Sequence, residues 1–517
     1  MNFKPFKLAG LLLSAALSLT AVSPVLAEDR PDIVIAVQDN PPKLDPVLFS
    51  RNVSLRTLYN VYDYPIKINF KNNWLLEPGL ASSWERIDDR TIELTLREGV
   101  KFHDGTEMTS EDFVFSYGPE HMSSEDSPGF ALTRPYMGTI ANVEALSPYK
   151  VRITSHAPDP LLEQRLAGWS SQIISKAAFE ATGDWDKWAL APVGTGPYKV
   201  AEYVSGDYLL LTAHDDYWGG KPPFASIRFQ IVPETAARIS GLIAGDFDII
   251  SEVEPDQFAT LESAEGVSVI GGAIANHRVI NLGTNTGWLA DAKVRKALSL
   301  AIDRELIADT IFGGKIEVPN GFQWEAYGEL YLADYPGATY DPDAAKALLK
   351  EAGYDGAPIP FRTQTGYYTG ELLTAQAVAD MWRAIGVNVD LQVKDGWGQV
   401  LEQPIDAAFN GSINMNYPDL LGSLWPLYGP TGFIQAKANT WSNDRFEEIG
   451  KILETEFDLE KRKALHREAL DIFHDIDPPA IVVHALGMFY GIRDGIKWEP
   501  YPLPYMDMRA ENAGTVN

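Results

Sequence analysis

The chain has 517 residues, which is too many for one ordinary hydrophobic core, so we expect two or three domains. With 45% apolar, 22% charged and 11% aromatic residues, its composition is that of a globular protein. The formal net charge of −28 argues against binding to nucleic acids or anionic membrane surfaces, because such binding depends on basic patches.

The first residues have the order of a signal peptide. Lys4 and Lys7 give a basic start, residues 8–22 form an apolar run, and Ala27 ends a plausible cleavage site. We therefore expect residues 1–27 to be removed by cleavage after Ala27. The run is too short to cross a bilayer, so we expect a soluble mature chain. The sequence contains no cysteine, hence no lipid-anchor cysteine, which favours a freely diffusing protein of a Gram-negative periplasm.

The first elements of the mature chain are strands. Residues 32–39 are an apolar run that predicts a buried strand, and Asn40 with the two prolines after it ends that strand. Residues 91–96 alternate between polar and apolar types, which predicts a half-buried strand. A turn at His103-Asp104-Gly105 follows, and residues 109–112 suit a helix start.

The middle of the chain continues this alternation. Residues 194–198, GTGPY, form a glycine-rich turn without the Lys-Ser/Thr of a phosphate-binding loop, so we interpret it as structural. Residues 227–232 predict another strand. Residues 281–306 then read as a strand, a polar loop and an amphipathic helix that Asp291 caps, with Val294 and Leu298 on its buried face.

Helices and short strands also alternate in the last part of the chain. Residues 340–354 predict a capped helix that ends at Gly353. A helix over residues 371–386 leads into a strand over 387–393, a long helical region covers 444–473, and residues 481–483 suggest a returning strand. This order indicates an α/β fold with parallel or mixed sheets.

Several stretches resemble one family. VRKALSLAIDRELI, residues 294–307, precedes Gly313-Gly314 and resembles a signature of the large peptide- and nickel-type solute-binding proteins that serve ABC importers. LREGVKFHDGT at residues 96–106, GTGPY at 194–198, YWGGKPP at 217–223 and AGDFD at 244–248 resemble further landmarks of that family in the correct order.

This resemblance implies an α/β, two-lobed periplasmic-binding-protein fold with mixed sheets and an inserted third subdomain. It assigns residues 28–60, 191–272 and 485–517 to lobe I, and residues 61–190 to the inserted subdomain. Lobe II would be residues 273–484. These boundaries come from the resemblance, because the composition alone does not place them.

The search for catalytic chemistry is mostly negative. The sequence has no G-x-S-x-G elbow, no H-E-x-x-H, no Walker A sequence and no cysteine nucleophile. None of its eight histidines has tight metal-ligand spacing, and we interpret His466 and His474 as parts of a solvated helix face. We therefore predict no enzyme, no metal and no cofactor.

A binding site between two lobes is expected to use aromatic and hydrogen-bonding side chains on loops. Tyr367, Trp397 and Trp425 lie in or beside predicted loops and are candidates for ligand contact. Asn40 is a further candidate, by position after the first strand, although an ordinary turn explains it equally well. The last candidates lie in residues 414–430.

Asn416 is the most diagnostic candidate. In peptide-binding relatives the matching place commonly reads D-Y-x-D, and its first aspartate pairs with the α-ammonium of the ligand. Here the sequence reads Asn416-Tyr417-Pro418-Asp419, so the charge is lost and Asp419 is the alternative anion. The arginine with which dipeptide binders hold a ligand carboxylate would fall near Thr365, where no arginine stands.

The resemblance implies a monomeric periplasmic protein that closes over a small organic ligand and delivers it to an ABC permease with separate ATPase subunits. A peptide or peptide-like solute, an opine included, is the first choice, and an oligosaccharide stacked on Trp397 and Trp425 is the second. Two alternatives from other classes are a secreted hydrolase of the same size and a chaperone-like peptide binder.

Overall fold

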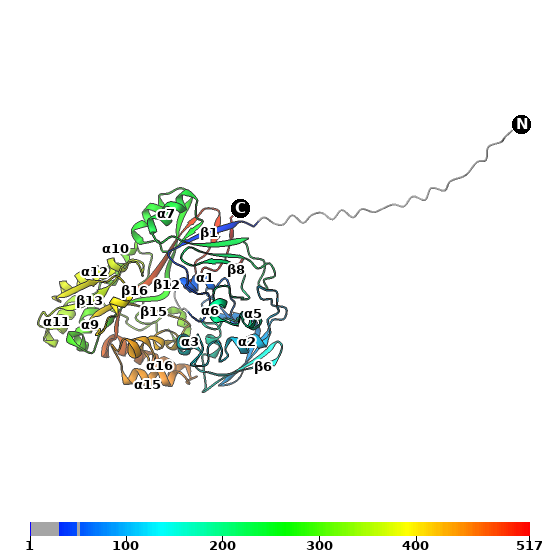
Figure 1. Ribbon diagram of the computed structural model, residues 1–517. Helices are drawn as coiled ribbons and strands as arrows, with labels where there is room; N and C mark the ends of the chain where they lie inside the picture. The colour runs from blue at the N-terminus through cyan, green and yellow to red at the C-terminus, as the bar shows by residue number, and fades with distance from the viewer. Residues whose placement is uncertain (2–29, 49–51, 517) are drawn as a thin grey trace.

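The computed structural model describes residues 1, 30–48 and 52–516 (Figure 1). The expected signal peptide and its cleavage site after Ala27 lie outside these residues. None of the helices in the described part is both long and apolar enough to cross a membrane.

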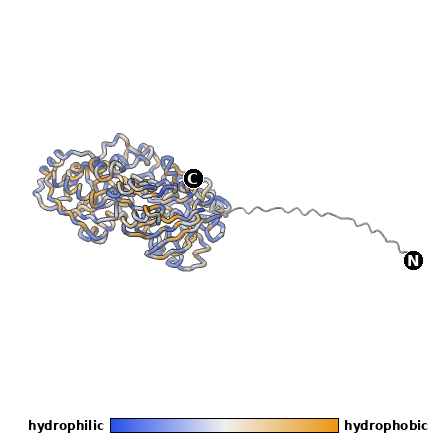
Figure 2. The backbone as a smooth tube through the Cα atoms, turned by 90° about the horizontal axis from the view of Figure 1, so that it is seen from above, coloured by the Kyte–Doolittle hydropathy of each residue, from blue (hydrophilic) through white to orange (hydrophobic). Residues whose placement is uncertain are grey.

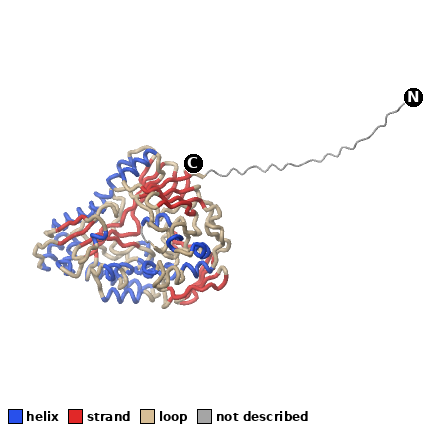
Figure 3. The backbone as a smooth tube through the Cα atoms, in the orientation of Figure 1, coloured by secondary structure: helices blue, strands red, loops and turns tan. Residues whose placement is uncertain are grey.

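A ten-stranded mixed sheet runs through the molecule. Its strands, in spatial order, are β14 (Val389–Val393), β13 (Ile359–Thr363), β15 (Ala408–Asn414), β12 (Val267–Leu282), β16 (Ala480–Arg493), β11 (Ile249–Ile250), β1 (Asp32–Val37), β10 (Ser226–Ile231), β9 (Tyr208–Ala213) and β8 (Tyr198–Val204). The long strands β12 and β16 pair antiparallel and belong to both halves of the sheet. We call the half with β1 and β8–β11 lobe I and the half with β13–β15 lobe II. Figure 3 shows these two groups of strands separately.

A smaller antiparallel sheet belongs to the part of the chain between β1 and β8. Its order is β4 (Ala81–Asp88), β5 (Thr91–Leu96), β7 (Lys150–Ser155) and β6 (Ile140–Ser147). Two hairpins complete the strands: β2 (Ile66–Asn69) with β3 (Leu75–Pro78), and β17 (Ile496–Trp498) with β18 (Ala513–Thr515). The four-stranded sheet packs on its own apolar cluster, which includes Phe102 and Phe113.

Helices surround the sheets. Those before β12 are α1 (Asn52–Leu58), α2 (Ser110–Ser116), α3 (Phe130–Met137), α4 (Leu162–Arg165), α5 (Lys176–Thr182), α6 (Trp185–Trp188), α7 (Thr235–Ala244) and α8 (Phe258–Glu262). Those after it are α9 (Ala292–Leu300), α10 (Arg304–Phe312), α11 (Pro342–Ala352), α12 (Glu371–Ala384), α13 (Trp397–Val400), α14 (Trp425–Tyr428), α15 (Asp444–Leu453) and α16 (Leu459–Asp471). Figure 2 shows hydrophilic segments at the outside of the molecule and hydrophobic ones through its interior.

The elements predicted from sequence are confirmed at most places. Asp291 caps α9 by accepting from the amide of Lys293, and Asp341 and Gly353 bound α11 as expected. The helix start near Thr109 forms a capping box with Asp112. The prediction of one long helical region over residues 444–473 is wrong in one respect, because the structure has two separate helices there, α15 and α16.

Two residues predicted on a solvated helix face are packed against aromatic rings instead. His466 is 2% exposed beside Tyr327, and His474 is half-buried against Phe322 and Tyr335. Arg304 of α10 is likewise buried and donates to the carbonyl oxygen of Val482 at 2.8 Å. Tertiary packing from distant segments explains both errors, since helical periodicity reports only local faces.

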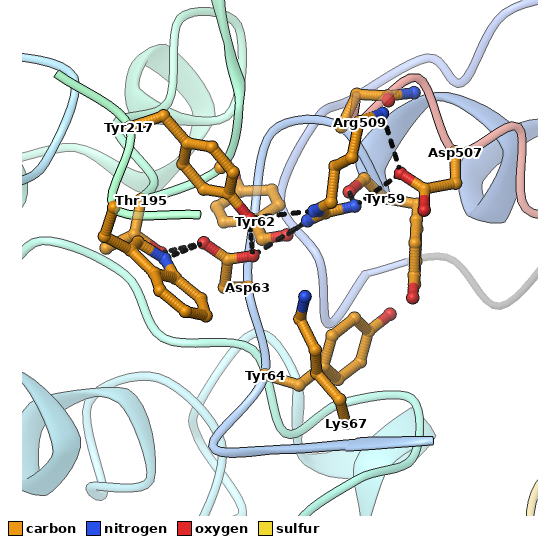
Figure 4. A network of polar contacts seen from close by, with 12 residues as sticks. Tyr59, Tyr62, Asp63, Tyr64, Lys67, Thr195, Tyr217, Asp507 and Arg509 are labelled. Atoms are coloured by element: carbon orange, nitrogen blue, oxygen red, sulfur yellow. Dashed lines mark hydrogen bonds and ion pairs between the residues drawn. The ribbon is translucent and has the colours of Figure 1, made fainter. Parts of the chain in front are cut away.

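A buried ion-pair network joins three distant segments of the chain (Figure 4). Arg509 contacts Asp63 at 2.8 Å and Asp507 at 2.9 Å, and its guanidinium lies over the ring of Tyr59. Asp63 also accepts from Tyr217 and from Trp218 and Thr195, at distances of 2.8 to 3.2 Å. The network therefore ties the C-terminal segment to the start of the four-stranded region and to the turn before β8.

Replacing Arg509 by methionine is expected to lower the free energy of unfolding by about 3–5 kcal/mol, because Asp63 and Asp507 would lose a buried cation. Urea denaturation measures this change. Lys71→Met is the matched control, since Lys71 also reaches the C-terminal segment, through Glu499 at 2.6 Å, but both side chains are exposed. That pair is worth about 0–1 kcal/mol. Equal losses in the two variants would contradict the role of the network.

The buried histidines predict a steep pH dependence of stability. Burial lowers the pKa of His466 to about 3, so the folded state keeps this ring neutral while the unfolded state binds a proton below its ordinary pKa. The same holds for His103, His277 and His484, each with a pKa of about 3, and for His474, at about 4. Their contribution is complete above pH 6.5 and is lost as the pH falls toward these values.

His466→Asn is therefore expected to reduce the slope of unfolding free energy against pH by about 1.4 kcal/mol per unit, in the range well below pH 6.5. Urea denaturation from pH 7.5 to pH 5 measures this slope. His156 is exposed, and His156→Asn is expected to leave the slope as in the unchanged protein. If both variants kept the same slope, His466 would not be the source of the linkage.

Candidate functional site

A cavity of about 700 Å³ lies between the lobes. Lobe I contributes the residues after β1, the start of α1, Arg238 of α7, and Glu252 and Glu254 after β11. Lobe II contributes residues 364–369 after β13 and residues 396–397 after β14, while residues 486–488 of β16 form the wall between the lobes. Because β1, β11, β13 and β14 all end here, the cavity occupies the place where α/β sheets usually bind ligands.

Arg56 is a buried cation beside this cavity. It lies on α1, its side chain is fully buried, and one of its terminal nitrogens contacts Glu252. Its Nε and Nη1 have no hydrogen-bond partner among the described residues. Burial lowers its pKa. A buried guanidinium with two unused donors is energetically costly, and a carboxylate is the group that best satisfies it.

The backbone of Glu252 is strained, and its side chain contacts Arg56. Its φ of 51° is in the left-handed region, which residues other than glycine rarely adopt. Arg238 supports this position from α7. Its guanidinium donates to the carbonyl oxygens of Ser251 and Glu252, and to those of Val232 and Pro233, at 2.8 to 3.2 Å. The donors of Arg238 are therefore all used within the protein, whereas Arg56 keeps donors without a partner among the described residues.

Glu254 connects the two lobes directly. Its Oε2 accepts from the backbone amide of Gly370 at 2.9 Å, immediately before α12. A carboxylate at the start of a helix is favourable because the helix dipole places positive potential there. Burial nevertheless raises the pKa of Glu254. This charge-assisted hydrogen bond thus joins lobe I to lobe II.

Aromatic side chains close the lobe II side of the cavity. Trp397 packs against the apolar clusters of both lobes, and its ring lies 5.4 Å from Tyr367 and 6.1 Å from Tyr368. The indole Nε1 of Trp397 is buried without a partner among the described residues. Behind Tyr368, the guanidinium of Arg278 lies 4.3 Å from the ring centre. The wall thus offers apolar surface with one unused hydrogen-bond donor.

The structure brings two of the predicted site residues together, since Tyr367 and Trp397 both line the cavity. Asn40 lies next to the lining residue Asp39, but it is 4% exposed and donates to the carbonyl oxygen of Phe229 at 2.9 Å. Its Oδ1 has no partner among the described residues. Asn40 therefore supports the loop after β1.

The other four predicted residues lie elsewhere, beside the segment that contains α3 and α4. Asn416 donates to the carbonyl oxygen of Gly422 at 3.2 Å and lies near Tyr136, outside the lining of the interlobe cavity. Tyr417 is buried and receives a hydrogen bond from Arg165. Trp425 donates to Glu454 at 3.0 Å and lines a separate cavity of about 300 Å³.

Asp419 has a structural role. It is 1% exposed, its Oδ1 accepts from the amide of Leu421 at 2.9 Å, and its Oδ2 contacts Arg462 at 2.5 Å. Both oxygens are therefore used inside the protein. The expectation that Asp419 supplies the anion for a ligand ammonium does not fit this placement, because Arg462 of α16 already neutralises it. Glu254 and Asp39, on the wall of the interlobe cavity, are the better placed carboxylates.

Sequence reasoning missed the charged residues that lie in and beside the cavity. Arg56 is part of a short helix with no distinctive pattern, and Glu252 and Glu254 belong to a chain with 71 acidic residues. No metal site replaces them, since the described residues contain no group of three or more His, Asp or Glu side chains arranged to hold a metal ion. The unused donors of Arg56 become visible only in three dimensions.

A cavity enclosed by two lobes that two long strands connect defines a binding protein of the two-lobed type. The chain belongs to the bacterial extracellular solute-binding proteins, family 5, whose middle region matches residues 76–435. The dipeptide-binding protein of Escherichia coli K12 is 25% identical to it, over 94% of this chain and 95% of that protein.

Solved structures of this fold confirm the predicted architecture. A dipeptide-binding protein from Pseudoalteromonas sp. SM9913, in complex with Met-Leu, matches with a TM-score of 0.81 and 21% identity, over 94% of this chain and 100% of that one. The binding protein AgaA from A. tumefaciens R10, in complex with agropinic acid, matches with a TM-score of 0.76 and 21% identity, over 94% and 99%. The two-lobed α/β fold expected from the sequence is correct.

The contact between Glu254 and Gly370 predicts a measurable closure energy. Glu254→Ala is expected to destabilise the contact between the lobes by about 1.4 kcal/mol, since a hydrogen bond to a charged group is lost. Hydrogen exchange at the Gly370 amide, followed by mass spectrometry, is then expected to become about tenfold faster. Glu265→Ala removes an exposed carboxylate of lobe I and serves as the control. Unchanged exchange at Gly370 would show that this contact does not hold the lobes together.

Proposed function

We propose that this chain is the periplasmic substrate-binding component of an ABC importer for a peptide or peptide-like solute, opines included. The observation that carries the proposal is the charge arrangement at the interlobe cavity. Arg56, buried beside the cavity in contact with the lining residue Glu252, has unused donors for a carboxylate, and Asp39 and Glu254 of the lining can accept from an ammonium group. A solute with both termini free matches this arrangement, and a cavity of about 700 Å³ is within the usual range for small ligands.

The relatives support this ligand class. The Escherichia coli relative is a dipeptide-binding protein, and the two solved structures hold a dipeptide and agropinic acid. Peptides and opines carry carboxylate and amino groups on a small organic frame, which suits the Arg56 and Glu254 sides of the cavity. Tyr367 and Trp397 would then contact the side chain of the solute, because they form its aromatic wall.

An oligosaccharide receives less support. The sequence suggested stacking on Trp397 and Trp425, but these two rings line different cavities. A hydrolase also receives less, because the family to which the chain belongs is one of solute-binding proteins. The proposal includes export with cleavage after Ala27, action as a monomer, delivery to a membrane permease with separate ATPase subunits, and the domain boundaries stated from the resemblance.

Closure is the proposed mechanism. A bound solute that contacts Arg56 in lobe I and Trp397 in lobe II stabilises the closed arrangement, because it interacts with both lobes only when they meet. The permease would then recognise the closed form. No bond is made or broken in this cycle.

A thermal-shift screen of the purified mature protein tests the proposal. Dipeptides with both termini free are expected to raise the unfolding temperature. At a hundredfold excess over its dissociation constant, such a ligand stabilises the native state by roughly 2.7 kcal/mol. The same peptides with an amidated C-terminus or an acetylated N-terminus are the matched controls. Both are expected to bind at least about tenfold more weakly, since each leaves a buried charge unpaired.

The screen also includes longer peptides, opines, oligosaccharides and nickel. Saturable shifts with oligosaccharides alone, or equal shifts for free and capped peptides, would contradict the proposed ligand class. The sequence makes Asn416 a candidate for ligand contact, but it lies outside the lining of the interlobe cavity. Asn416→Ala is therefore expected to leave peptide affinity unchanged, and weaker binding in that variant would return Asn416 to the site.

A further inference from the structure

A second cavity, of about 310 Å³, lies against the connecting strands β12 and β16. His277 of β12 and Ala485 of β16, which pair across the two strands, line it. Leu486 and Met488 line the interlobe cavity instead. The two cavities share no lining residue, so they are separate spaces beside β12 and β16.

Aromatic rings and carboxylates make up much of this second cavity. Trp74 from the β2–β3 hairpin and Trp324 and Tyr331 from the segment after α10 bring their rings to its wall. Glu317 and Glu325 lie at its exposed rim. Among the described lining residues there is no lysine or arginine. A cation is therefore favoured, because aromatic faces and carboxylates both attract positive charge.

Two buried ring nitrogens in this wall have no partner. His277 is 3% exposed and stacks on Trp324, with ring centres 3.9 Å apart. Neither His277 Nδ1 nor Trp324 Nε1 has a hydrogen-bond partner among the described residues. The indole N–H needs an acceptor, and the neutral imidazole can accept at Nδ1 when Nε2 carries its proton. A single hydroxyl group satisfies both, since it accepts one hydrogen bond and donates another.

Trp74 is held toward this cavity by an unusual turn. Asn73 and Trp74 both have positive φ, 49° and 59°, in the turn between β2 and β3. Such conformations cost free energy and persist only where the surrounding structure imposes them. Phe70 packs edge-on against Trp74 at 4.9 Å between ring centres and holds the indole in place.

We propose that this cavity is a second binding site, for a small amino alcohol. Its ammonium group lies among Trp74, Trp324 and Tyr331 with Glu317 and Glu325 at the rim, and its hydroxyl bridges His277 and Trp324. The site is distinct from the proposed peptide site, because the two cavities have no lining residue in common. A ligand here contacts both strands that join the lobes.

Calorimetric titration of the full mature protein with choline tests the proposal. Choline is expected to bind saturably at millimolar concentration or below. Its neutral isostere, 3,3-dimethylbutan-1-ol, is expected to bind at least about tenfold more weakly, because it lacks the charge. Tetramethylammonium is expected to bind about fivefold more weakly than choline, because it lacks the hydroxyl group.

Two variants and one control place the site. Trp324→Phe keeps an aromatic ring but removes the N–H, so it is expected to weaken choline about fivefold and to leave tetramethylammonium unchanged. Glu325→Gln alters only an exposed side chain and is expected to weaken both ammonium ions about twofold. Trp288→Phe removes an indole N–H that is bonded to Asp355, far from the cavity in the fold, and is expected to change nothing.

Two results would overturn the proposal. One is the absence of saturable choline binding at millimolar concentration. The other is choline binding that a dipeptide displaces and that Trp324→Phe and Glu325→Gln both leave unchanged, because such binding would belong to the interlobe cavity. Failure of peptide binding alone would leave the second site standing, and failure of choline binding would leave the importer function standing.

Discussion

The antiparallel pairing of β12 with β16 is the constraint on which the rest of the structure depends. In the described chain β12 pairs with β15 of lobe II and β16 pairs with β11 of lobe I, so the ladder between β12 and β16 joins the two halves of the large sheet. Their register is irregular between Ala273 and His277 and again after Arg278, which breaks the ladder at the level of both cavities. Any movement of one lobe relative to the other must bend the strands here.

Electrostatics explains why the interlobe cavity sits where it does. The fold buries Arg56 and Arg238 and half-buries Glu252 and Glu254 around the ends of β1 and β11, where a packed apolar cluster would be more stable. Arg238 has all its donors in use, whereas Arg56 does not. The strained backbone of Glu252 belongs to the same cluster. Unfavourable terms gathered at one place are typical of a binding site, because a ligand can relieve them.

Much of the fold was predictable from the sequence, and less of the site. Local signals identified β1, the strand and capped helix around Asp291, and the bounds of α11, because caps and periodicity depend on neighbouring residues. Loop position was enough to place Tyr367 and Trp397 at the cavity. Asp419 was misassigned because its partner, Arg462, is a tertiary neighbour from α16, and Arg56 was overlooked because its importance lies in the partners it lacks. Burial of His466 and His474 depended on packing from residues 322–335, which no helical pattern contains.

The contact of Arg509 with Asp63 also has a consequence for biosynthesis. Residues that meet in this network are 446 positions apart, so the N-terminal half of the chain cannot complete its own packing while the ribosome is still adding later residues. Strand β1 likewise cannot pair until β10 and β11, which come later in the chain, have been synthesised. A nascent chain therefore stays incompletely packed until residue 509 emerges from the ribosome. Late closure of lobe I thus couples the order of synthesis to the moment at which the protein first becomes stable.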